Sequence, residues 1–126
     1  MTDMPPEDMV DGLAELLNPY MRRILGGSED PHDVVDELKW TLTEAPHMEH
    51  SWGAGWLYRM WGSLSDIIDG YPVDFGPDRE AIAIREFRHA AQDWLGMPRT
   101  RAGLESYIER QRTRLASLWS PGPRTE

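Results

Sequence analysis

The chain has 126 residues, which fits a single domain with its own hydrophobic core. It has no cysteine, which excludes disulfides and thiolate zinc sites. No apolar run approaches the ~20 residues that a membrane-spanning helix needs, and the acidic start "MTDMPPEDMVDG" lacks the order of a signal peptide. We therefore expect a cytoplasmic protein that does not bind membranes.

The net charge of −9 is spread unevenly. Residues 1–50 contain twelve acidic and three basic side chains, whereas residues 51–126 contain ten of each. All of the excess charge therefore lies in the first part of the chain. Such a field repels nucleic acid and anionic membranes and attracts a basic partner, although acidic charge also serves solubility alone.

The first predicted helix spans residues 6–25. Its apolar stripe keeps its phase across Pro19, which predicts a helix kinked at this proline or two short helices in line. Two glycines at positions 26 and 27 end it. The residues of the stripe recur at helical spacing, and they are Val10, Leu13, Ala14, Leu17, Met21, Ile24 and Leu25.

The second predicted helix has clear start and stop signals. Asp30 suits the N-cap and Pro31 the first helical position, while Pro46 ends the helix. Its apolar stripe consists of Val34, Leu38, Leu42 and Ala45.

The third predicted helix spans residues 51–69, with Ser51 as N-cap. On a wheel of ~100° per residue its large apolar side chains fill an arc of roughly 180°, which predicts a central helix that packs on several neighbours. Gly55 and Gly62 fall together on the opposite side and predict a smooth patch where another backbone comes close. The apolar arc consists of Trp52, Trp56, Leu57, Met60, Trp61, Leu64, Ile67 and Ile68.

Two further helices complete the pattern. The fourth begins near residues 77–78 and ends at Leu95, and the fifth is capped by Thr100 and reaches about Trp119. No segment reads as a strand. The sequence predicts an all-α fold, a bundle of four to five helices in one domain over residues 1–126, with residues 6–119 as its core and tails at 1–5 and 120–126.

Two patterns raise the question of a metal site. His47 and His50 flank Glu49 at a spacing that suits a shared metal on a helix, but they follow Pro46 and are expected in a polar loop. No catalytic-serine, phosphate-loop or dinucleotide motif is present, so we expect no cofactor.

The second pattern concerns carboxylates on two helices. "DVVDE" (Asp33, Asp36, Glu37) and "SLSD" (Ser63, Asp66) resemble fragments of the all-α nucleotide pyrophosphohydrolases, which bind magnesium through carboxylates on two successive helices. Serine stands in "SLSD" where that family has a metal-binding carboxylate. The resemblance implies a magnesium-dependent hydrolase of nucleotides that would use Asp33, Asp36, Glu37 and Asp66.

The second helix carries the most suggestive feature of the sequence. Trp40 lies far from the apolar stripe on the wheel, so it is expected on the outward face unless it packs under the first helix or a tail. An exposed tryptophan among carboxylates is typical of a surface that binds a basic protein. Its neighbours on the wheel are acidic, namely Asp33, Asp36, Glu37 and Glu44.

These observations favour a non-enzymatic interaction domain. The most specific form is an immunity or antitoxin-type inhibitor that binds a basic effector through Asp33, Asp36, Glu37, Trp40 and Glu44, with no role for nucleic acid. The alternatives are the magnesium-dependent hydrolase and an oligomeric structural or phage-type assembly protein whose tryptophan face continues across a subunit interface.

Overall fold

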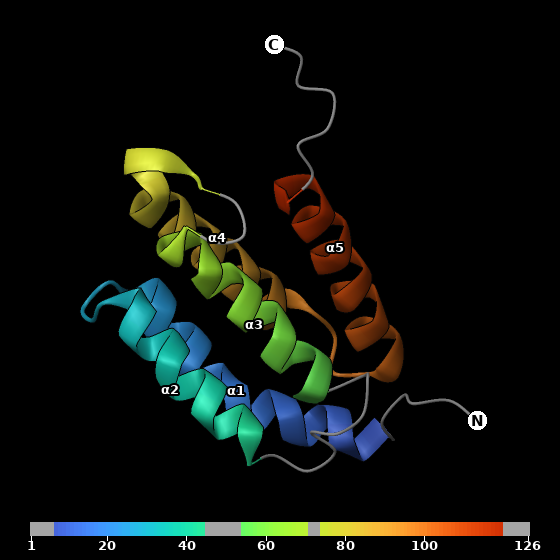
Figure 1. Cartoon of the computed structure of the whole chain (residues 1–126). Helices are drawn as coiled ribbons and strands as arrows, with labels where there is room; N and C mark the ends of the chain where they lie inside the picture. Colours follow the sequence, from blue (N-terminus) through green and yellow to red (C-terminus); the bar gives the residue numbers. More distant parts are fainter. Residues whose placement is uncertain (1–6, 45–53, 71–73, 120–126) are drawn as a thin grey trace.

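The computed structural model describes residues 7–44, 54–70 and 74–119, and within them it contains helices and no strand. The helices are α1 (Glu7–Gly26), α2 (Pro31–Thr43), α3 (Ala54–Asp69), α4 (Arg79–Gly96) and α5 (Arg101–Trp119). A short 3₁₀ turn, η1 (Gly76–Asp78), precedes α4. The predicted all-α bundle is confirmed (Figure 1).

Helices α1 to α4 form a four-helix bundle in which each helix runs antiparallel to the one before it (Figure 1). α1 packs against α2 and α4, and α3 packs against the same two helices from the other side. α5 packs more lightly, on α1 and α4 (Figure 1). Within the described residues, no helix is long and apolar enough to cross a membrane.

The core lies where the predicted stripes meet. Trp61 of α3 is fully buried and its ring contacts that of Phe87 in α4, with centroids 6.2 Å apart. The prediction of a central third helix is confirmed by its buried side chains, which are Leu57, Met60, Trp61, Leu64 and Ile67. Ser51 and Trp52 lie outside the described residues.

Two predicted N-caps form as expected. The Asp30 carboxylate accepts a hydrogen bond from the backbone N–H of His32 at 3.0 Å, and the Thr100 hydroxyl accepts one from that of Gly103 at 2.9 Å. α1 passes through Pro19 as one helix, so two separate short helices are not formed. A kink at Pro19 stays a prediction.

The close approach predicted at Gly55 and Gly62 was wrong for Gly62, and for Gly55 it stays a prediction. A Cβ built at Gly62 meets no heavy atom of the described residues within 4 Å, so none of their backbones comes close there. A close approach that was not predicted occurs at Gly103, where a Cβ would collide with the carbonyl oxygen of Pro98. The first turn of α5 folds back over the preceding loop, and only glycine leaves room for that contact.

Buried polar side chains fix α4 against its neighbours. The indole Nε1 of Trp94 donates to Oδ1 of Asn18 in α1 at 2.8 Å, and the Tyr107 hydroxyl of α5 donates to the carbonyl of Ala90 at 3.1 Å. Each of these polar groups therefore has a partner inside the core, as burial requires.

Candidate functional site

Trp40 stands on the outward face of α2 with 72% of its surface exposed. The opposite face of the helix is held in the core by buried apolar side chains, which are Val34, Val35, Leu38 and Leu42. This placement confirms the prediction that Trp40 faces outward and excludes the alternative that it packs under α1. Exposed tryptophan is uncommon, because its large ring gains more from burial than most side chains do.

Trp40 divides its polar neighbours into two groups. On a helix of ~100° per residue, Glu37 lies ~60° to one side of Trp40, whereas Asp36 lies ~40° and Thr43 ~60° to the other. The structure shows the same division: Glu37 bonds to a residue of α1, and Asp36 and Thr43 line a pocket toward α3.

The α1 side is occupied by Arg23. Its guanidinium donates to Glu37 at 3.0 and 3.1 Å and to Glu29 at 2.8 and 2.5 Å. Its carbon centre lies 5.6 Å from the centroid of the Tyr20 ring, a cation–π arrangement. The hydrogen bonds from Arg23 lower the pKa values of both carboxyls, Glu29 and Glu37. Glu37, expected among the partner-binding acids, is thus already engaged within the chain.

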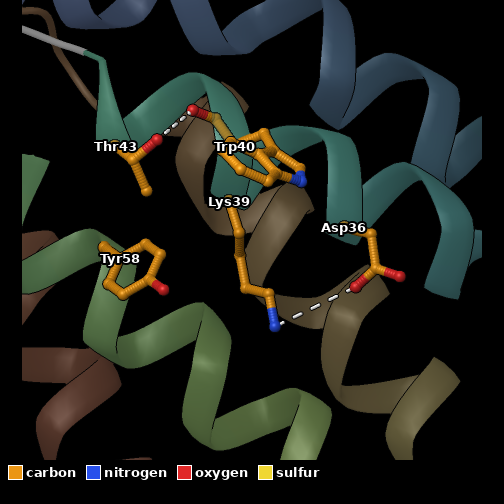
Figure 2. A pocket seen from close by; sticks show the side chains of 5 residues that line it. All are labelled: Asp36, Lys39, Trp40, Thr43 and Tyr58. Atoms are coloured by element: carbon orange, nitrogen blue, oxygen red, sulfur yellow. Dashed lines mark hydrogen bonds and ion pairs between the residues drawn. The ribbon is translucent and has the colours of Figure 1, made fainter.

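The α3 side contains a pocket of about 360 Å³, the Trp40 pocket, which is lined by Asp36, Lys39, Trp40, Thr43 and Tyr58 (Figure 2). Tyr58 reaches it from α3, and the other four side chains come from α2 (Figure 2). The Thr43 hydroxyl donates to the carbonyl of Trp40 at 2.6 Å. Lys39 Nζ lies 3.9 Å from Oδ1 of Asp36, a long contact for an ion pair.

Ion pairs between the described residues neutralise several acids of the first part of the chain. They do not neutralise all of the acids near Trp40. Arg99, before α5, binds Asp11 at 3.0 Å and Glu15 at 2.8 Å, so it neutralises acids of α1 as Arg23 neutralises Glu29 and Glu37. Within the described part of the chain, Asp33 of α2 and Glu44 at the C-cap of α2 make no ion pair, and both are exposed. Among the acids of residues 10–44, those on the outward face of α2 are therefore the least compensated by ion pairs with the described residues.

The carboxylates proposed for magnesium do not converge. Glu37 points to Arg23 on the α1 side, and Asp66 lies on α3. Burial and the neighbouring charge of Asp69 raise the pKa of Asp66, while Lys39 opposes this shift. Lys39 Nζ also lies 3.9 Å from Oδ1 of Asp36, so a cation of the chain itself already faces this carboxylate. Over the described residues, no group of three acidic or histidine side chains has the geometry of a metal site. His47 and His50 lie outside them.

Sequence reasoning missed three residues of the pocket: Lys39, Thr43 and Tyr58. Thr43 could have been found, because it is three residues after Trp40 and thus adjacent on the helix surface. Lys39 lies near the edge of the helix face that carries Trp40, so the wheel could also have indicated it. Tyr58 could not have been found from the sequence, because its place beside Trp40 depends on how α3 packs against α2.

Comparison with known proteins provides no further guide to the site: no family model, curated protein or solved structure matches the chain.

Proposed function

We propose that the domain is a non-enzymatic interaction module that binds a basic protein through the outer face of α2, defined as Asp33, Asp36, Trp40 and Glu44. The observation that supports it most is the 72% exposure of Trp40, a side chain that contributes strongly to binding when a partner covers it. The carboxylates of Asp33 and Glu44 beside it, which make no ion pair with the described residues, would steer a cationic partner and favour its orientation.

The rigidity of α2 also supports this proposal. The helix has a formed N-cap, a buried apolar face and the Tyr20–Thr41 hydrogen bond of 2.7 Å that ties it to α1. A partner would meet a preformed surface, which lowers the entropy cost of binding. Glu37 is placed outside this surface, because Arg23 already holds its carboxylate.

The most specific form of the proposal is an immunity or antitoxin-type inhibitor of a basic effector such as a nuclease. The small all-helical fold, the net charge of −9 and the exposed aromatic anchor suit a protein that covers a cationic active site. This form adds one requirement to the general proposal: binding must abolish the activity of the partner.

Affinity capture from the source organism tests the proposal. The immobilised wild type is compared with Trp40→Ala and with Leu16→Ala, which removes another exposed apolar side chain, on α1. We expect a basic protein on the wild type and on Leu16→Ala and its loss on Trp40→Ala. A partner retained by all three would contradict the proposal. Light scattering on the isolated protein separates it from the assembly alternative, which requires a stable oligomer.

A further inference from the structure

We infer that the Trp40 pocket binds an arginine side chain of the partner, with the guanidinium stacked on the indole ring and paired with Asp36. This inference rests on the proposed function, and it names the chemical group that the outer face of α2 recognises.

The pocket offers the groups that a guanidinium uses. Trp40 and Tyr58 supply two aromatic rings from two helices, and Asp36 supplies a carboxylate whose side chain is 55% exposed (Figure 2). Arginine is planar, stacks on aromatic faces and donates in a fork that matches a carboxylate. Tryptophan is the best of the aromatic partners for a cation.

The protein already holds one of its own arginines in the same way. On the other side of α2, Arg23 lies over the ring of Tyr20 and donates to two carboxylates, Glu29 and Glu37. The Trp40 pocket repeats this arrangement of ring and carboxylate. None of its five lining residues is an arginine.

Among the described residues that line the pocket, Lys39 is the one whose charge opposes a cation. Its contact with Asp36 is long, at 3.9 Å, and its charge also acts on Asp66 of α3. The long contact of 3.9 Å holds Lys39 to Asp36 only weakly, so a guanidinium that pairs with Asp36 can take its place. It acts as an internal competitor that a bound arginine displaces.

This competition makes opposite predictions for two neighbouring residues. Removing the carboxylate with Asp36→Asn should weaken arginine binding, whereas removing the competing charge with Lys39→Met should strengthen it. If the surface attracted cations only through net charge, its affinity for them would fall equally on the loss of any acid. Glu105→Gln, an exposed glutamate of α5, provides the matched control.

The experiment is a titration of the ¹⁵N-labelled full chain, followed through the indole N–H signals, with Trp40→Phe identifying that of Trp40. The probes are capped peptides of six arginines or six lysines at equal ionic strength. We expect the arginine peptide to perturb the Trp40 indole most and to bind about threefold tighter than the lysine peptide, as stacking on an aromatic ring predicts. Asp36→Asn should reduce its affinity by a similar factor, with Glu105→Gln unchanged.

Equal affinity of the two peptides, equal effects of Asp36→Asn and Glu105→Gln, or a Trp40 indole that does not respond would each overturn the inference. Its failure is distinguishable from that of the proposed function. A partner captured through Trp40 with no arginine preference refutes only the pocket chemistry. Selective arginine binding together with capture that is insensitive to Trp40→Ala refutes only the proposed function.

Discussion

Arg114 of α5 holds the buried carboxylate of Glu86 in α4 through two hydrogen bonds, from Nε to Oε1 at 2.5 Å and from Nη2 to Oε2 at 3.1 Å. The Glu86 side chain is 2% exposed, whereas that of Arg114 is 37% exposed. Because α5 packs lightly on the bundle, this pair is one of the contacts that fix its position, together with the hydrogen bond from Gln111 to Asp93 at 2.8 Å.

Loss of Arg114 should leave a buried charge without its main partner. We expect Arg114→Ala to lower the free energy of unfolding by about 3 kcal/mol, as for other buried pairs broken on one side. The double variant Glu86→Leu with Arg114→Leu should recover most of this loss, because no charge then remains buried. Urea unfolding measures both, and a cost below about 1 kcal/mol for Arg114→Ala would contradict its role as the main partner of Glu86, whose carboxylate also lies 3.4 Å from Nη2 of Arg85.

Two glycines of the helices should respond in opposite directions to alanine. Gly103→Ala places a methyl group against the Pro98 carbonyl and should cost about 1–3 kcal/mol. Gly62→Ala meets open space inside α3 and should gain about 0.5–1 kcal/mol, since alanine is the better helix former. Thermal unfolding of the two variants compares them directly. The same sign for both would contradict the positions of these two backbones.

The Arg23 cluster should stabilise the fold in a pH-dependent way. Hydrogen bonds from Arg23 lower the folded-state pKa values of Glu29 and Glu37. A lowered carboxyl pKa contributes stability above the unfolded value of about 4.3, and this contribution is lost as pH falls through the folded value. Arg23→Gln should therefore be less stable than the wild type at pH 7, and the difference should vanish under strongly acidic conditions.

Urea unfolding at neutral and acidic pH checks this prediction. The adjacent Arg22→Gln provides the control, because Arg22 is exposed and has the same charge. Its effect should be small and nearly independent of pH. A difference between wild type and Arg23→Gln that stays constant across the pH range would contradict the assignment of these ion pairs.

Helical periodicity was enough to predict most of the fold. The stripe of α2 gave the helix its buried face and left Trp40 outside, and the caps at Asp30 and Thr100 formed as their side chains predict. Spacing within one helix depends only on local geometry, so a single sequence contains this information. It does not contain how one segment packs on another, and this is why a close approach was predicted at Gly62, where the described residues make none, and was missed at Gly103.

The site shows the same limit. The acids around Trp40 were predictable from the wheel, but their ion pairs were not, because Arg23 and Tyr58 reach α2 from neighbouring helices. The wheel places Glu37 and Asp36 on opposite sides of Trp40, but it does not show that the first bonds to α1 and the second lines the Trp40 pocket. Which charges remain for a partner is decided by tertiary packing.

The affinity of the captured partner for three variants tests the central claim most directly. Trp40→Ala should weaken binding by about 2 kcal/mol, roughly 30-fold, as expected of an interface anchor, while its own stability changes by no more than about 0.5 kcal/mol because the side chain is exposed. Asp33→Lys should weaken binding more at low salt than at high salt, and Leu16→Ala should bind as the wild type does. Unchanged affinity of a correctly folded Trp40→Ala would contradict the assignment of the α2 face as the binding surface.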